Sequence, residues 1–182
     1  VFALRFGEYF ALLKSSFHSA FAWQNGSKLK HDLRYTPAEV FETFPWPAND
    51  LHALRQLGEQ YQLKRLEIMD SKRFGLTGLY TRFHEPDDID PQIAKLRALH
   101  VQIDQAVLVA YGWQDIPLNH QFHSVSYLPA TDHIRYTVSE EARLEILRRL
   151  SRLNRERYEE ERRQAEMEGQ AQATDRSAGT RR

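Results

Sequence analysis

The chain has 182 residues, with 25 basic residues (Lys and Arg) against 25 acidic ones, and it contains no cysteine. Disulfides, thiolate metal sites and cysteine nucleophiles are therefore excluded, and the composition fits a reducing compartment, so we expect a cytoplasmic location. The formal net charge of zero means that nucleic-acid binding would require a local basic patch or a basic partner domain. Because no apolar run is long enough to span a bilayer, we expect no membrane partner.

The N-terminal segment predicts a helix that leads into a basic strand. Five apolar residues recur at helical spacing and would share one face: Leu12, Leu13, Phe17, Ala20 and Phe21. The Asn-Gly pair at Asn25 is a strong turn pattern, and the residues from Lys28 to Tyr35 alternate well enough for a short strand. The chain starts at Val1 within an amphipathic segment, so we expect it to be a piece of a larger protein.

The stretch RYTPAEVFETFPWP, residues 34–47, predicts a short capped helix with a rigid exit. Thr36, Pro37 and Glu39 match a capping box with proline at the first helical position. The helix must be short, because Pro45 disfavours helical geometry at Phe44. The predicted buried side chains are Val40, Phe41 and Phe44. We expect this segment to act as a clasp between the N-terminal part and the rest of the chain.

Two long helices are predicted in the middle of the chain. The first begins at a cap, Asn49 or Asp50, and ends near Asp70. Its buried stripe is Leu51, Leu54, Gly58, Tyr61, Arg65 and Ile68. The second begins at Asp90 with Pro91 and ends at the C-cap Gly112. Its stripe is Ile93, Leu96, Leu99, Ile103, Ala106, Val107 and Ala110. The residues between the two helices are predicted to form a loop.

The C-terminal part predicts an irregular segment, a last helix and a tail. Residues 113–138 hold one short strand, around 134–138, and either Ser139 or Thr137 with Glu140 caps the helix that follows. Its predicted apolar residues are Leu144, Leu147, Leu150 and Leu153. From Glu159 the helix has no apolar face, and the last residues have a disordered composition. The predicted fold is mainly α: a small α+β unit (1–47), a helical domain (48–162) and a disordered tail (163–182).

Several residue groups resemble metal, nuclease or cofactor sites, but each is better explained by a structural role. His120 and His123 lack an evident third ligand, which a zinc site requires. The acidic stretch 84–90 could suggest a magnesium-dependent nuclease, but the residue two before Lys95 is Ile93 rather than an acid, and that segment is predicted to be helical. The stretch is expected to form a solvated loop. The glycines Gly75 and Gly78 follow a helix rather than the strand that a cofactor-binding loop needs. We therefore expect no catalytic residue, metal site or cofactor site in this chain.

Residues 26–35 carry a local concentration of basic side chains. Lys28, Lys30, His31 and Arg34 stand against the single acid Asp32. Basic residues that alternate with apolar ones on a strand suit contacts to nucleic-acid phosphates. The pattern is weak by itself, because exposed strands commonly carry lysine.

Three blocks of the sequence resemble one protein family in the same order. SSFHSAFAW with GSKLKHDLRYTPAEVFETFPWP resembles the end of the target recognition region of large bacterial DNA adenine-N6 methyltransferases, of the single-chain restriction-modification or phage-defence type. FGLTGLYTRFHEP and IAKLRALHVQIDQAVLVAYGWQDI resemble the helical stretch that follows in that family. HQFH and RYTVSEEARLEILRRLSRLNRERYEEE resemble its closing segment. Together the blocks cover roughly Phe10 to Arg162.

The resemblance implies a parent enzyme that transfers a methyl group from S-adenosylmethionine to adenine in double-stranded DNA, after the base has left the stack. This chain has no Pro-Pro pair, and so lacks the family's Asn-Pro-Pro-aromatic motif. It also lacks the family's glycine turn for the cofactor. The resemblance therefore implies a noncatalytic C-terminal piece that works with an upstream methyltransferase domain, where the cofactor would bind.

The expected DNA-binding residues lie in the first block. Lys28, Lys30 and Arg34 are predicted to contact phosphates, and Asn25 and His31 are weaker candidates for contacts to base edges. An alternative hypothesis, based on the neutral charge and the leucine-striped helices, is a helical module that assembles with a protein subunit of a defence system. An intact small enzyme is the third hypothesis, and no acid-base pair or nucleophile supports it.

Overall fold

The computed structural model describes residues 7–29, 32–49 and 51–179, without the side chains of residues 28, 29, 32 and 169–179. The chain is mainly helical, as predicted. Its elements are α1 (Gly7–Lys14), α2 (Ser16–Asn25), β1 (Ser27–Leu29), β2 (Asp32–Arg34), the π-helix η1 (Pro37–Phe41), α3 (His52–Lys72), α4 (Leu76–Phe83), α5 (Pro91–Tyr111), β3 (Gln121–Ser124), β4 (Ile134–Thr137) and α6 (Glu140–Gly179).

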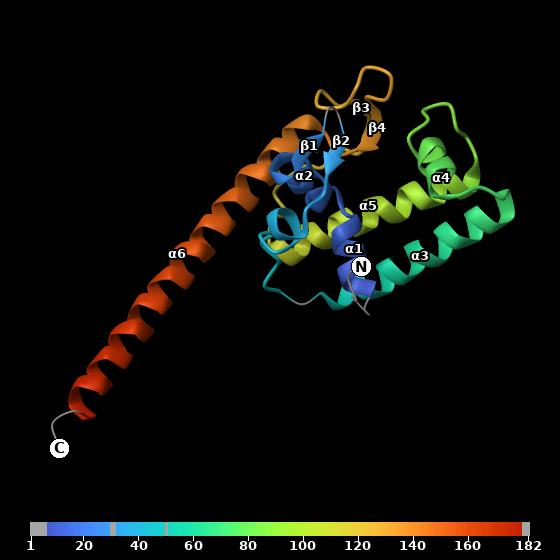
Figure 1. The fold of residues 1–182 in the computed structure, drawn as a ribbon. Coiled ribbons are helices and arrows are strands. Elements are labelled where there is room, and N and C mark those ends of the chain that lie inside the picture. The colour runs from blue at the N-terminus through green and yellow to red at the C-terminus, as the bar shows by residue number, and fades with distance from the viewer. Residues whose placement is uncertain (1–6, 30–31, 50, 180–182) are drawn as a thin grey trace.

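The long helices α3 and α5 lie side by side, and α1 packs against α3 (Figure 1). α2 packs against the first part of α6, whose remainder projects away from the body. One continuous cluster of buried side chains joins these elements and includes Phe17 of α2, Tyr61 of α3, Ile103 of α5 and Ile146 of α6. Residues from both predicted segments, 1–47 and 48–162, therefore share one core. Within the described residues, no helix is both long and apolar enough to cross a membrane.

Two glycines allow α1 and α3 to touch through their backbones. A Cβ atom placed on Gly58 would lie 2.0 Å from the carbonyl oxygen of Gly7, and one placed on Gly7 would lie 2.4 Å from the carbonyl oxygen of Arg55. Both distances are far below contact between non-bonded atoms. The predicted position of Gly58 on the buried stripe of α3 is confirmed, together with Leu54, Tyr61 and Ile68.

We expect Gly58→Ala to lower the free energy of unfolding by about 1–3 kcal/mol, because the added methyl group must push α1 away from α3. Urea denaturation followed by circular dichroism measures the loss. Gly75→Ala is the matched control, since a Cβ at Gly75 meets no atom within 4 Å. Equal stability of the two variants would contradict the close backbone contact.

The predicted limits of α5 are confirmed by its caps. The side chain of Asp90 accepts a hydrogen bond from the backbone N–H of Gln92 at 2.9 Å, and Pro91 occupies the first turn. Gly112 ends the helix in the left-handed conformation, with φ of 72°. Glycine adopts this conformation without a steric cost.

The predicted loop between α3 and α5 contains a helix, α4, whose Leu79 and Phe83 are buried. The prediction missed it because two glycines interrupt the segment, although these two apolar residues fall one helical turn apart. Leu76, at the start of this helix, is 48% exposed. The prediction of a side-chain cap for α3 is also wrong for Asn49, whose amide donates instead to the carbonyl of Ala110 at 2.9 Å. Asp50 lies outside the described residues.

The sequence predicts one strand in each of two places, and the structure has a two-stranded antiparallel hairpin in each of them. β1 pairs with β2, and β3 pairs with β4. The N-terminal helix is likewise divided into α1 and α2 at Ser15, whose side chain accepts a hydrogen bond from the N–H of His18. The break arises because Ser15 leaves helical geometry to cap the second helix.

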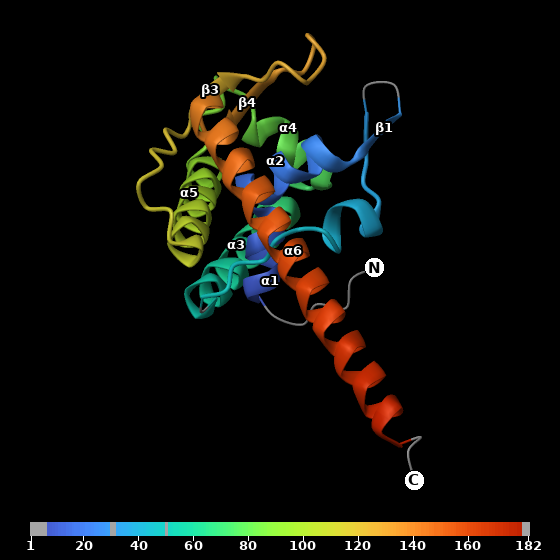
Figure 2. The ribbon, with the colours of Figure 1, turned by 90° about the vertical axis from the view of Figure 1, so that its left-hand side faces the viewer.

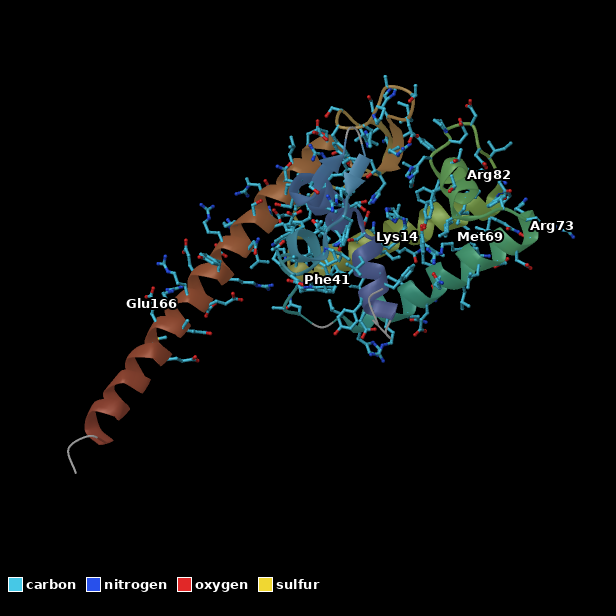
Figure 3. The ribbon with its side chains drawn as sticks, in the orientation of Figure 1. Lys14, Phe41, Met69, Arg73, Arg82 and Glu166 are labelled. Atoms are coloured by element: carbon cyan, nitrogen blue, oxygen red, sulfur yellow. The ribbon has the colours of Figure 1, made fainter. Side chains whose placement is uncertain are left out.

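Helix α6 begins as predicted, with the hydroxyl of Ser139 accepting from the N–H of Ala142 at 3.2 Å. The predicted leucine stripe is wrong at Leu144, which is 53% exposed, whereas Ile146 and Leu150 are fully buried. The helical backbone continues to Gly179, through the segment for which the composition predicts disorder. Side chains 161–168 of this segment are exposed, and Glu166 stands on the projecting part (Figure 3). Disorder there stays a prediction.

Candidate functional site

The predicted DNA-binding residues cluster at the β1–β2 hairpin, which extends from the helical body beside η1 (Figure 2). Ser27 lies opposite Arg34, and Lys28 lies opposite Leu33. Lys30 and His31 fall outside the described residues. Because positions alternate along a strand, Lys28 and Arg34 occupy positions on opposite faces of the two-stranded ribbon. The hairpin therefore brings Lys28 and Arg34 close together in the chain's fold, but it does not place them on one face.

Asn25 and Arg34 are both exposed, but the side chain of Asn25 also forms a hydrogen bond within the fold. The amide of Asn25 donates to the carbonyl of Phe21 at 2.9 Å, which closes the last turn of α2. Asn25 therefore has a structural role, and its side-chain oxygen and its second amide N–H stay available to a base edge. Its assignment to DNA, like those of Lys28, Lys30, His31 and Arg34, stays a prediction.

Aromatic side chains attach the base of the hairpin to the core. The ring of Phe44 contacts the rings of His18, Phe21 and Trp46 edge to face, with centroid distances of 5.0, 5.2 and 5.7 Å. The hydroxyl of Tyr35, next to β2, lies 3.2 Å from Nε2 of His18. These contacts connect the segment and the hairpin to α2, within the N-terminal part. The hydroxyl of Tyr111, at the end of α5, donates to the carbonyl of Pro45 at 2.9 Å and connects the predicted clasp to the helical part.

The clasp differs from the prediction in two details. The hydroxyl of Thr36 donates to the carboxylate of Glu39, and it does not cap the backbone. This hydrogen bond between side chains takes the group that a capping box would use. Val40 and Phe44 are buried as predicted, but Phe41 is only half-buried and lies against Trp46, with 5.3 Å between ring centroids.

A buried polar cluster, formed by Ser16, His100, Asp104 and His120, links three segments at the centre of the molecule. Asp104 is fully buried and accepts three hydrogen bonds: from the N–H of Ser16 (2.8 Å), from the hydroxyl of Ser16 (2.6 Å) and from Nε2 of His120 (2.8 Å). Nε2 of His100 lies 3.2 Å from the hydroxyl oxygen of Ser16. The cluster joins α2, α5 and the segment before β3.

The charges of this cluster follow from burial and hydrogen bonding. Burial alone would raise the pKa of Asp104, but His100 and the hydrogen bonds from His120 and Ser16 bring it below its ordinary value. Burial lowers the pKa of His100 to about 4. A carboxylate therefore stays ionised inside the protein, next to a neutral imidazole.

The cluster is not arranged as a catalytic triad. In a triad, the imidazole bridges the hydroxyl and the carboxylate, whereas here the hydroxyl of Ser16 donates directly to Asp104. Nδ1 of His100 is buried without a hydrogen-bond partner among the described residues. The arrangement holds segments together and does not activate Ser16 as a nucleophile.

This cluster was not predicted, because Ser16 is separated from Asp104 by 88 positions. One pattern could have revealed it. His100 and Asp104 lie four residues apart on the apolar stripe of α5, where ionisable side chains are rare unless they are paired.

The two histidines that are candidate metal ligands, His120 and His123, are held by protein groups instead. His120 binds Asp104, whereas His123 lies 2.9 Å from the carbonyl oxygen of Asn119. Among the described residues, no group of three or more His, Asp or Glu side chains is placed to hold a metal ion.

The acidic loop 84–90 is exposed at Glu85 and Asp87, as predicted, whereas its other two carboxylates form ion pairs. Asp88 pairs with Arg82, and Asp90 pairs with Arg82 and Lys72. The buried guanidinium of Arg97 donates to four backbone carbonyls, those of Arg82, Phe83, Glu85 and Asp88. The loop is thereby fixed from inside.

We expect the protein to lose stability in mild acid. Burial is the main cause that lowers the pKa of His18 to about 4, of His84 to about 3 and of His100 to about 4. The unfolded chain binds these protons below pH about 6.5, while the folded protein does not. The free energy of unfolding should therefore be flat above pH 7 and fall between pH about 6.5 and 4, by up to about 1.4 kcal/mol per pH unit for each histidine.

Urea titrations at a series of pH values measure this dependence. His18→Gln should reduce the slope of stability against pH, and His52→Gln, a change at an exposed position of α3, should leave the slope unchanged. A stability that stays constant from pH 7 to 4.5 would refute the assignment of three buried neutral histidines.

No family model, no curated protein and no solved structure matches this chain.

Proposed function

We propose that this chain is the noncatalytic C-terminal part of a site-specific DNA adenine-N6 methyltransferase of restriction-modification or phage-defence type, where it contributes target recognition and scaffolding. The observation that supports this function best is the β1–β2 hairpin, a projection with basic positions joined to a helical body (Figure 2). The major groove of DNA admits a two-stranded ribbon of this kind.

The two faces of the hairpin suit different contacts in that role. Leu33 packs against the core. The face of the hairpin that carries Leu33 is therefore directed toward the helical body. Arg34 is exposed on the opposite face. In that role Arg34 would bind a phosphate from the exposed face, and Lys28 would bind one from the face that carries Leu33. Lys30 would also bind a phosphate, while His31 would reach a base edge.

The clasp and the buried polar cluster would act as the scaffold. Phe44 and Tyr35 connect the hairpin to α2, and the bonds from Asp104 to Ser16 connect α2 to α5. A rigid base positions a ribbon for groove contacts at a lower entropic cost. S-adenosylmethionine and the transfer step belong to the upstream domain of the proposed parent, because none of the residues described here forms a catalytic arrangement.

DNA binding by the chain tests the recognition role. We expect the triple variant Lys28→Ala, Lys30→Ala and Arg34→Ala to weaken binding to duplex DNA. The slope of log K against log salt should become less steep by about 2.7, or about 0.9 for each lost phosphate contact. Fluorescence anisotropy at four salt concentrations measures both quantities.

The matched control removes three exposed cations from α5 and α6: Lys95→Ala, Arg155→Ala and Arg162→Ala. It should preserve the slope. Equal affinity and equal slope for the wild type and the hairpin variant would reject the DNA role of these residues. Self-association without DNA binding would instead favour the helical assembly module. An Asn-Pro-Pro-aromatic motif in the reading frame upstream of Val1 would support the family, and a frame that encodes no methyltransferase would reject it.

A further inference from the structure

A cavity of about 160 Å³ lies where the α1–α2 junction, the end of α4, α5 and the β3–β4 hairpin meet. An engineered protein cavity of about 150 Å³ accepts benzene, so this cavity has room for one ring-sized group. An adjoining hollow of about 690 Å³ between α4 and the hairpin shares His84 and Arg135 with it. A ring in the cavity could therefore carry a larger substituent that extends into the hollow.

Aromatic side chains form much of the cavity wall. Trp23 and Tyr127 lie on one side, with 5.2 Å between ring centroids. Phe83 and Tyr136 also line the cavity and contact each other edge to face at 5.8 Å. Flat aromatic surfaces of this kind stack on the faces of nucleobases.

Two cationic residues, Lys14 and Arg135, line the cavity. Arg135 forms an ion pair with Asp132, which lines the adjoining hollow, so Lys14 supplies the positive charge that no described carboxylate offsets. Lys14 stands at the end of α1 (Figure 3), with its ammonium 4.0 Å from the centre of the Tyr80 ring. Lys14 forms no ion pair with any described residue. Burial, together with the charges of Arg135 and Lys14, lowers the pKa of His84 to about 3. These observations favour an anionic ligand.

Hydrogen bonds assign the tautomers of two histidines in the wall. The hydroxyl of Ser16 donates to Asp104 and so accepts from Nε2–H of His100, which leaves Nδ1 of His100 as a buried acceptor without a partner among the described residues. Nδ1 of His84 accepts from the N–H of Tyr136 at 3.2 Å, so its Nε2 carries a hydrogen. Both histidines line the cavity. The wall is therefore polar as well as aromatic, which suits a heteroaromatic ring better than a plain hydrocarbon ring.

We propose that this cavity binds a nucleotide, with the base between the aromatic walls and the phosphate near Lys14 and Arg135. The nucleotide could be a free mononucleotide or an unpaired nucleotide of a strand, which share this chemistry. The proposal goes beyond DNA recognition by the β1–β2 hairpin and does not depend on it.

Quenching of tryptophan fluorescence in the full chain tests the proposal, with Trp23→Phe used to assign the signal. The probes are adenosine 5′-monophosphate, cytidine 5′-monophosphate, adenosine, inorganic phosphate and a single-stranded pentanucleotide. We expect a mononucleotide or the pentanucleotide to bind at least tenfold more tightly than adenosine or phosphate. Tighter binding of the pentanucleotide would identify a strand as the source, and tighter binding of a mononucleotide would identify the free ligand.

Three variants connect binding to the cavity. Lys14→Met should weaken nucleotide binding at least tenfold, and Lys95→Met, at an exposed position of α5 outside the cavity, should not. Ser19→Phe places a ring at an exposed position of the wall and should block binding without a change in charge. Thermal unfolding confirms that each variant is folded.

Two results would overturn the proposal: no binding of any nucleotide at millimolar concentration, or phosphate binding as tightly as the nucleotides. The hairpin variant Lys28→Ala, Lys30→Ala and Arg34→Ala should bind mononucleotides normally. This outcome separates the cavity from the proposed DNA-binding surface.

Discussion

Asp104→Ala is expected to lower the free energy of unfolding by about 3–5 kcal/mol, because removal of one partner from a buried charged network leaves the others unpaired. The backbone N–H and the hydroxyl of Ser16 would lose their acceptor, and so would Nε2 of His120. These groups lie inside the protein, where an unsatisfied donor cannot turn to solvent. The segment before β3 would also lose its hydrogen bond to α5.

Chemical denaturation of the variant, followed by circular dichroism, measures this loss. Asp115→Ala is the matched control, because Asp115 forms an exposed ion pair with Arg149, and such a pair contributes about 0–1 kcal/mol. A double-mutant cycle with Ser16→Ala isolates the coupling between the two residues. A loss below about 1 kcal/mol for Asp104→Ala, the range of an exposed pair, would show that the cluster does not hold the helices together.

The local part of the fold was predictable, since local patterns determine helix ends. Asp90 followed by Pro91, and Gly112, define both ends of α5 through groups that lie within two residues of each end. Helix α4 was missed, because the glycines Gly75 and Gly78 resemble a turn when they are considered alone. In the structure, Gly75 sits at the N-cap and Gly78 packs against Phe74. The helical contribution of Leu79 and Phe83 depends on their burial against the rest of the molecule.

The site depended more on long-range contacts, and these are not encoded in local spacing. The register of the hairpin determines which basic positions in residues 26–35 share a face. A single strand would have placed Lys28 and Arg34 on the same face, whereas the hairpin places them on opposite faces. The buried cluster required Ser16, His100, Asp104 and His120 to be brought together from separate segments. A sequence pattern identifies candidate polar residues on an apolar stripe, and only the tertiary structure identifies their partners.

Phe44→Ala is expected to destabilise the protein by about 3 kcal/mol, as truncations of large buried side chains do. Phe44 is 2% exposed, and its ring contacts the rings of His18, Phe21 and Trp46. The loss should exceed that of Phe41→Ala, because Phe41 is half-buried. Thermal and urea denaturation of both variants measure the difference.

The same pair of variants separates the clasp from the DNA-binding surface. Phe44 connects the base of the hairpin to α2 and presents no polar group to DNA, so its removal should weaken DNA binding only in proportion to the unfolded fraction. At a temperature where Phe44→Ala is fully folded, its affinity for duplex DNA and its salt slope should equal those of the wild type. A variant with full stability but lost DNA binding would place Phe44 in the recognition surface. A variant with lost stability and normal binding when folded would support its role in holding the hairpin on the helical body.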